Sequence, residues 1–206
     1  MKKIVLCPAR MGRPRAFDTD RALEAAMRVF WTKGYEGTTL TDLTDATGVS
    51  RPSLYSAFGN KEALFKMALD RYVREKLDFI DRAIEAPTAR GVAKALLHGM
   101  LAMQASDSDP KGCMGVINSV ACGAEAETIR ADVLARALVI RNALIARFEQ
   151  AREEGDLPLD TNPVALTAFL IAILQGTALQ AGAGASYQEL ESLVAGSLAL
   201  WPGTPA

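Results

Sequence analysis

Residues 38–61 read TTLTDLTDATGVSRPSLYSAFGNK, and the fold is decided in this stretch. Thr38 and Thr39 supply hydroxyls that can cap the start of a helix. Gly48 suits the left-handed backbone that ends a helix, and Ser50 is a second N-cap residue. The stretch therefore predicts a helix, a tight glycine turn and a second helix, which is the pattern of a helix-turn-helix unit.

The second helix of this unit carries side chains that suit DNA better than a protein core. We expect Leu54, Ala57 and Phe58 to face inward. The other side chains are polar, small or basic and can meet base edges or phosphates in a major groove. These residues are Arg51, Pro52, Ser53, Tyr55 and Ser56.

The longer segment 38–65, TTLTDLTDATGVSRPSLYSAFGNKEALF, resembles the DNA-binding signature of the tetracycline-repressor (TetR) family of bacterial transcriptional regulators. The matching features are the opening threonines, Ala46, Gly48-Val49-Ser50, Leu54-Tyr55, Phe58 and Lys61-Glu62 followed by Leu64. The likeness runs from about Phe17 to Leu69, and the rest of the chain agrees only in length and helical texture. The resemblance implies an all-α fold with an N-terminal three-helix helix-turn-helix DNA-binding domain and a larger helical ligand-binding and dimerisation domain. It also implies a repressor that a small-molecule effector releases from a palindromic operator in double-stranded DNA.

Carried over position by position, the resemblance implies which residues face DNA. They are Thr41, Arg51, Pro52, Ser53, Tyr55, Ser56 and Lys61. Arg51 is the best candidate for reading sequence, because a guanidinium can bond guanine O6 and N7 together, worth about 1–3 kcal/mol of discrimination. Pro52 and the Tyr55 ring can contact a thymine methyl, whereas Ser50, Ser53, Ser56 and Lys61 suit phosphates. The alternative for each residue is a solvated helix face.

Charge is distributed unevenly along a chain of 206 residues with a net charge of −1. Up to Lys61 there are 10 Lys and Arg against 6 Asp and Glu, and from Glu62 onward 13 against 18. A basic N-terminal module on an acidic body fits a DNA contact at one end, although chance gives the same imbalance. Within residues 1–16 we expect a flexible basic arm in which Arg13 and Arg15 enter a minor groove. The alternatives are a solvated tail and a translational start at Met11.

Helical periodicity and the resemblance together divide the chain. The expected segments are the arm (1–16), the DNA-binding domain (17–61), a linking helix (62–84) and an effector-binding and dimerisation domain (85–206). Asn60 caps the linking helix, and its apolar stripe continues to about Ile84, so we expect one unbroken helix between the two modules. By the family's mechanism, an effector shifts this helix and changes the spacing of the two reading helices of a dimer.

Residues 163–200 are the expected homodimer interface, because they hold the two last helices and the family pairs there. Eight residues would form the contact: Leu170, Ile173, Leu174, Thr177, Leu190, Leu193, Val194 and Leu198. The alternative is that these helices complete a monomer core. The apolar stretch 163–183 also carries Thr and Gln, so we interpret it as a buried helix and expect no membrane span.

The resemblance further implies an enclosed site for a small apolar or electrophilic effector. Its candidate lining residues are Met67, Phe79, Met100, Met103, Cys113, Met114, Ile117 and Phe148. Methionine adapts its shape and suits such a pocket, although methionine at helical spacing is more often core packing.

Cys113 is also a redox candidate. It follows Gly112 at the expected start of a helix, beside Lys111, where a positive environment favours a thiolate. In the family that the chain resembles, some members with a Gly-Cys pair at the start of this helix respond to electrophiles or oxidants through that thiol. The favoured alternative is a small buried hydrophobe.

Three cysteines make no even disulfide framework, and the apolar run Ile4–Cys7 is too short for a signal peptide, so we expect a cytoplasmic protein. His98 is the single histidine, and neither a metal site, a catalytic triad nor a phosphate loop is indicated. We therefore expect no cofactor and no enzyme. The competing classes are an enzyme that uses the apolar pocket and an architectural DNA-binding protein without a ligand.

Overall fold

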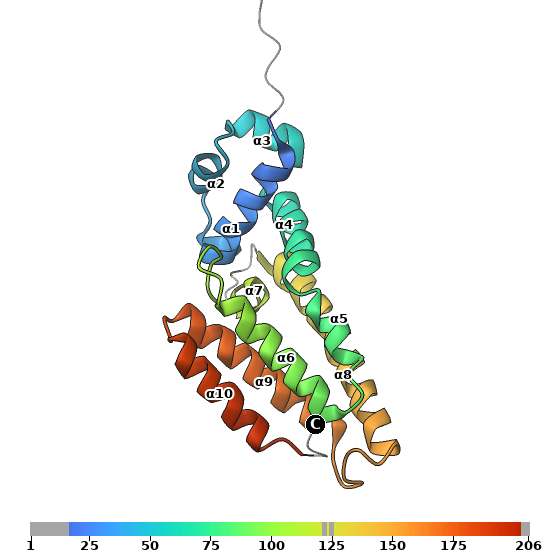
Figure 1. Cartoon of the computed structure of the whole chain (residues 1–206). Coiled ribbons are helices and arrows are strands. Elements are labelled where there is room, and N and C mark those ends of the chain that lie inside the picture. The colour runs from blue at the N-terminus through green and yellow to red at the C-terminus, as the bar shows by residue number, and fades with distance from the viewer. Residues whose placement is uncertain (1–16, 121–122, 124–125, 203–206) are drawn as a thin grey trace, which may run out of the picture.

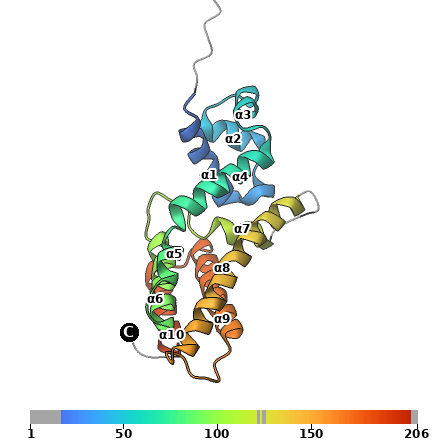
Figure 2. The same cartoon turned by 90° about the vertical axis from the view of Figure 1, so that its right-hand side faces the viewer.

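The structure, a computed structural model, describes residues 17–120, 123 and 126–202. Within these ranges the regular elements are helices, which confirms the predicted fold class (Figure 1). The helices are α1 (Thr19–Gly37), α2 (Leu40–Thr47), α3 (Arg51–Phe58), α4 (Lys61–Lys76), α5 (Phe79–Ile84), α6 (Ala89–Gln104), α7 (Met114–Val120), α8 (Glu127–Glu153), α9 (Pro163–Gly182) and α10 (Tyr187–Ala199). In both views the molecule is elongated, with a small head at one end and a larger body at the other (Figures 1 and 2).

The head consists of α1, α2 and α3 with the first turns of α4 against them. Asp18 caps α1, because its carboxylate accepts hydrogen bonds from the backbone N–H groups of Asp20 and Arg21. Thr39 caps α2 in a reciprocal capping box, and Gly48 ends α2 with φ at 66° in the left-handed region. These local features confirm the predicted helix-turn-helix unit.

The prediction of one unbroken helix from Asn60 to Ile84 is wrong. α4 ends at Lys76, and α5 begins at Phe79 after a two-residue bend. The apolar side chains of α4 pack with those of α1, α2, α3 and α7 in one core, which we call the core beneath the head. Those of α5 pack in the core of the body. The helix therefore breaks where the chain passes from one core to the other. The Phe79 ring then lies against Gly99 of α6, where the missing side chain leaves room for it.

The body is a bundle of α5, α6, α8, α9 and α10 (Figure 2). α6 packs on α5, α9 and α10, and α8 packs on α9. The fully buried side chains at its centre include Val92, Leu97, Leu144, Phe148 and Leu170. The head projects from one end of this bundle (Figure 2).

α9 is the one helix among the described residues whose length and composition would allow it to cross a membrane, a test that the core helices of soluble proteins also pass. It packs against α6, α8 and α10. These neighbours bury one side of α9, and 33% of its most apolar stretch is buried within the chain, so the expectation of a buried helix holds for that side only.

α7 connects the head to the body through a buried amide. Asn118 is 2% exposed, and its Oδ1 accepts a hydrogen bond from the backbone N–H of Tyr35 at 2.7 Å. Its Nδ2 donates to the carbonyl of Met114 at 2.8 Å. The end of α1 is thus held by a side chain of α7.

The loop between α6 and α7 makes a second connection, this time electrostatic. The Asp109 carboxylate lies 2.8 Å from Arg28 Nη1 of α1 and 2.6 Å from Lys76 Nζ of α4. Burial opposes ionisation of Asp109, but the hydrogen bonds from Lys76 and Arg28 outweigh it and lower its pKa below the ordinary 3.8. A lowered carboxyl pKa stabilises the fold fully above that ordinary value, and the contribution is lost as the pH falls through the folded-state pKa. The Asp109 carboxylate is therefore ionised at neutral pH, and its contacts with Arg28 and Lys76 are ion pairs.

Asn118→Ala is expected to lower the free energy of unfolding by about 1–3 kcal/mol, because it removes the buried side-chain acceptor that lies 2.7 Å from the Tyr35 nitrogen. Urea denaturation followed by circular dichroism measures the change. Ser119→Ala is the matched control, since the Ser119 hydroxyl donates to the Val116 carbonyl within α7 itself. Equal losses in the two variants would contradict a special role for Asn118.

Candidate nucleic-acid interface

α3 lies at the tip of the head, far from the body (Figure 1). Leu54 and Phe58 anchor it, because both are buried in the same core as Leu43 of α2. Its exposed residues are Arg51, Pro52, Ser53, Ser56 and Ala57, and Tyr55 is half-buried. The prediction that Ala57 faces the core is wrong, because two anchors four residues apart already cover the inner side of this two-turn helix.

Arg51 is the first residue of α3, and its side chain is held by Tyr55 one turn later. The guanidinium carbon of Arg51 lies 5.6 Å from the centroid of the Tyr55 ring. A cation over an aromatic face gains about 0.5–1 kcal/mol at an exposed site. The contact keeps the Arg51 donors on the outer side of α3, where they can bond O6 and N7 of a guanine.

Ser50 occupies the N-cap position of α3, but its hydroxyl makes no capping hydrogen bond. It donates instead to the Oγ of Ser53 at 3.0 Å. The predicted position is therefore confirmed and the predicted side-chain cap is wrong. The first backbone N–H groups of α3 keep their hydrogen-bonding capacity at the end of the helix where the dipole favours anions.

Lys61 and Thr41 flank α3 on the neighbouring helices. Thr41 is exposed on α2, and Lys61 is half-buried at the start of α4. The Lys61 ammonium lies 4.5 Å from the centroid of the Tyr35 ring. Burial lowers the pKa of Lys61, and the charge of Glu36 opposes this effect. The sequence analysis did not predict the contact with Tyr35. The signal for it in the sequence is an aromatic residue directly after Gly34, the glycine at which α1 bends.

The residues predicted to line an effector site do not lie together in one place. Met100, Cys113 and Met114 are buried in the core beneath the head, and Met103 and Ile117 pack against it. Phe148 and Phe79 belong to the core of the body, and Met67 is exposed on α4. An effector site lined by these residues stays a prediction, and the structure divides them between two cores. Arg13 and Arg15 lie outside the described residues.

Cys113 is buried directly before α7. Its sulfur lies 3.3 Å from the Tyr72 hydroxyl, which donates a hydrogen bond to it. Burial raises the pKa of Tyr72 well above its usual value, so this hydroxyl stays protonated and remains a donor. The Lys111 ammonium donates to the carbonyls of Gln104 and Ser106, so its hydrogen bonds go to those oxygens and not to the thiol.

A capped helix, a left-handed glycine turn and an exposed helix with an outward arginine together define a helix-turn-helix DNA-binding protein. Residues 22–68 match the family described as bacterial regulatory proteins, tetR family, and residues 91–195 match the tetracyclin repressor-like C-terminal domain. The chain belongs to the TetR family of bacterial DNA-binding transcriptional regulators.

Relatives cover almost the whole chain. The HTH-type transcriptional repressor ComR of Escherichia coli (strain K12) is 34% identical over 93% of this chain and 92% of its own length. A structure of the TetR family regulator CifR, a cysteine mutant complexed with 26-bp double-strand operator DNA, has a TM-score of 0.85. It is 37% identical and covers 92% of this chain and all of that one. A regulator from Rhodococcus sp. RHA1 is 36% identical over 89% of this chain and 98% of its own, with a TM-score of 0.61.

Arg51→Ala is expected to reduce the preference for a selected operator over random duplex by about 1–3 kcal/mol, because the bidentate contact with guanine is lost. The operator is first selected from random duplexes, and competition gel-shift assays then measure the preference. Arg82→Ala is the control, since Arg82 is an exposed arginine on α5 in the body. Unchanged selectivity of Arg51→Ala would contradict base reading by Arg51.

Proposed function

We propose that this regulator is a repressor that binds a palindromic operator as a homodimer and leaves it when a small apolar effector binds the body. The observation that carries the proposal is the exposed α3, with Arg51 over Tyr55 and Lys61 beside it. ComR is named a repressor, and CifR is described in complex with operator DNA, which supports the same role here. The protein would act in the cytoplasm, by binding and not by catalysis.

The division of labour follows the predicted segments. Residues 17–61 would contact the major groove, residues 62–84 would link the modules, and residues 85–206 would bind the effector and the second subunit. One such head buries too little surface for tight binding at physiological salt, and two heads on a twofold axis remedy this by reading a palindrome.

The surface for pairing is an exposed apolar stripe along α9. Its members fall on one side of a helix with 3.6 residues per turn. They are Val164, Ala165, Ala168, Phe169, Ala172 and Leu179. A second copy of the chain would cover this stripe by an isologous contact, in which the same surface serves both subunits.

The particular side chains predicted for pairing lie elsewhere. Leu170 and Thr177 of α9 and Leu190 and Val194 of α10 are buried within their own chain, so they cannot form the contact as predicted. The four others, Ile173, Leu174, Leu193 and Leu198, are half-buried. The helical period was read correctly, but the most apolar face is the one that the chain's own core uses. The proposed interface therefore lies on the other face of α9.

Phe169→Glu is expected to convert a dimer into a 22.0 kDa monomer, because each subunit would bury a carboxylate at the contact. Analytical ultracentrifugation measures the mass, and operator affinity should fall with it. Leu159→Glu is the matched control, since Leu159 is an exposed leucine in the loop between α8 and α9. A Phe169→Glu protein that remains dimeric would contradict pairing through this stripe.

Effector binding can reach the head where the two cores meet. Phe79 packs in the core of the body against Gly99 of α6. Met100, which follows Gly99 in α6, packs in the core beneath the head. An apolar molecule inserted here would separate α5 from α6 and move α4. It would act only if its affinity differs between the two head positions.

A second candidate function is an electrophile- or oxidant-responsive repressor that acts through Cys113. The Tyr72 hydroxyl of α4 bonds the sulfur at the entrance to α7, so this thiol joins two of the elements that hold the head. The site is close-packed, since Cys113 is 7% exposed and Tyr72 and Met114 are fully buried. Atoms added to the sulfur would therefore force α4 and α7 apart.

Alkylation with N-ethylmaleimide is expected to weaken operator binding, and Cys113→Ser is expected to prevent this. Gel-shift assays measure the affinity, and mass spectrometry of peptides confirms which cysteine carries the adduct. If Cys113→Ser responds as strongly as the unaltered protein, the thiol function is contradicted while the apolar effector remains.

A further inference from the structure

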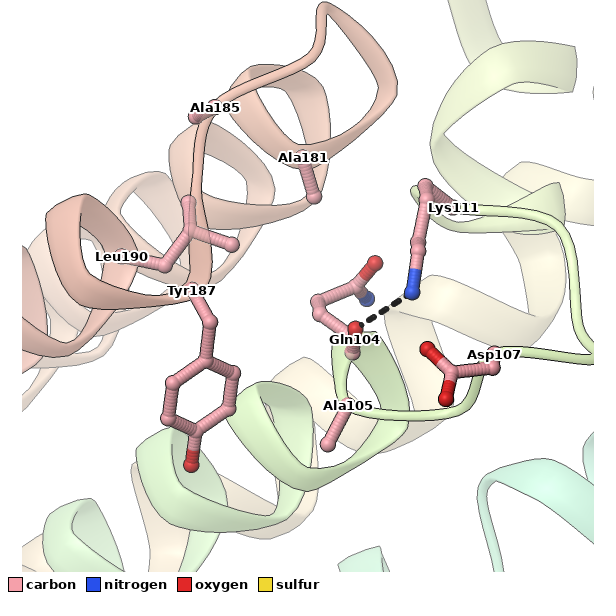
Figure 3. A pocket seen from close by; sticks show the side chains of 8 residues that line it. All are labelled: Gln104, Ala105, Asp107, Lys111, Ala181, Ala185, Tyr187 and Leu190. Atoms are coloured by element: carbon pink, nitrogen blue, oxygen red, sulfur yellow. Dashed lines mark hydrogen bonds between the residues drawn. The ribbon is translucent and has the colours of Figure 1, made fainter.

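A pocket of about 310 Å³ lies outside the two cores, at the junction of the α6–α7 loop with the α9–α10 turn (Figure 3). It is lined by Gln104, Ala105, Asp107, Lys111, Ala181, Ala185, Tyr187 and Leu190. A volume of this size is at the lower end for small-molecule sites, which run from about 300 to 1,000 Å³. The pocket therefore suits a ligand of few atoms.

The two sides of the pocket differ in chemistry. Figure 3 shows Lys111 and Asp107 on one side, and Ala181, Ala185 and Leu190 with the ring of Tyr187 on the other. The first side carries one positive and one negative charge, and the second is apolar. A complementary ligand has two opposite charges at one end and an apolar group at the other.

Neither charge is neutralised by an ion pair within the part of the chain that the structure describes. The Lys111 ammonium donates to the Gln104 carbonyl at 2.8 Å and to the Ser106 carbonyl at 2.7 Å, which are uncharged acceptors. An ammonium has three donors, and within the described residues no ion pair is formed by Lys111. Among the same described residues, no hydrogen bond or ion pair is made by the Asp107 carboxylate. Both groups can therefore meet a ligand.

We propose that this pocket binds a free amino acid with a branched apolar side chain. The ligand carboxylate would pair with Lys111 and the ligand ammonium with Asp107. The side chain would lie against Ala181 and Leu190. Lys111 and Asp107 lie on the same side of the pocket (Figure 3), so one ligand that carries both ionic groups at one end can meet them together.

The pocket shares a wall with the head-to-body junction. Lys111 also lines a groove of about 950 Å³ between head and body, together with Arg28 and Asp109. The neighbouring Gly112 is held from both sides by Gln104, whose Oε1 accepts from the Gly112 N–H at 2.8 Å and whose Nε2 donates to the Gly112 carbonyl at 3.3 Å. A ligand that binds Lys111 would thus act on the loop that carries Asp109.

This loop would transmit occupancy of the pocket to the DNA-binding head. Asp109 bonds Arg28 of α1 and Lys76 of α4, so a shift of the loop changes how the head is held. Binding of the amino acid stands on the pocket alone, whereas its effect on the operator rests on the proposed function.

Isothermal titration calorimetry of the full chain tests the binding with three probes. They are L-leucine, 4-methylpentanoate, which lacks the ammonium, and isopentylamine, which lacks the carboxylate. L-Leucine is expected to bind about fivefold more tightly than either analogue, the size that one partly exposed ion pair supports.

Two variants assign the charges. Lys111→Met is expected to weaken L-leucine about fivefold and leave isopentylamine unchanged, and Asp107→Asn is expected to weaken L-leucine by a similar factor and leave 4-methylpentanoate unchanged. Lys94→Met and Asp160→Asn are the controls, because both residues are exposed at other places in the body. Asp107 has an exposed carboxylate without a structural contact among the described residues, so its variant will fold even if the loop of Lys111→Met loosens.

Absence of saturable heat with L-leucine up to about 10 mM would overturn the proposal, as would equal binding by all four variants. Gel-shift titration with the selected operator then tests the transmission. Binding of L-leucine without any change in operator affinity would overturn the link to the head and leave the pocket assigned. A protein that prefers no duplex would contradict the proposed function and leave the calorimetric result intact.

Discussion

The packing of α1 against α4 is the contact on which the rest of the structure depends. Phe30 of α1 meets Phe65 of α4 edge-on at a centroid distance of 5.1 Å, and Trp31 meets Tyr72 in the same way at 4.8 Å. These four rings are almost completely buried. A head of this size has a high ratio of surface to volume and gains little from a core of its own. Its core accordingly continues into the body through Cys113 and Met114.

Sharing a core makes the position of α3 a property of the whole chain. α3 is anchored on α2 and α4, α4 is packed on α1, and α1 is held by α7 and by the loop before it. A displacement of α7 or of this loop therefore cannot stay local, because closely packed interiors transmit strain. Two of the proposed points of control, Cys113 and the pocket beside Lys111, lie on the same segment between α6 and α7. Neither would need to contact DNA to alter the distance between the two reading helices of the proposed dimer.

The sequence predicted local features well where a single residue type has one physical use. Gly48 ends α2 with a positive φ, and Thr39 caps it, as their types dictate. Prediction failed where the outcome depends on which core a helix faces. The stripe from Asn60 to Ile84 is continuous as a pattern, but it serves two cores, and the backbone bends between them. Nothing local marks this bend, since neither Gly nor Pro occurs there. The contact of Lys61 with Tyr35 was missed for a related reason, because it joins residues far apart in the chain.

α9 shows why sequence alone could not tell which face of this helix is buried within its own chain and which stays exposed. The helix is apolar almost all round, so periodicity cannot say which side its own chain covers. The structure shows that α6, α8 and α10 cover the side of Leu170 and Thr177. Only 33% of its most apolar stretch is buried within the chain. A helix that is apolar on every side is stable in water only when it is covered on every side. Because α9 packs in a body that carries a DNA-binding head, the second copy that we propose would satisfy this requirement and would also supply the second head that a palindrome needs.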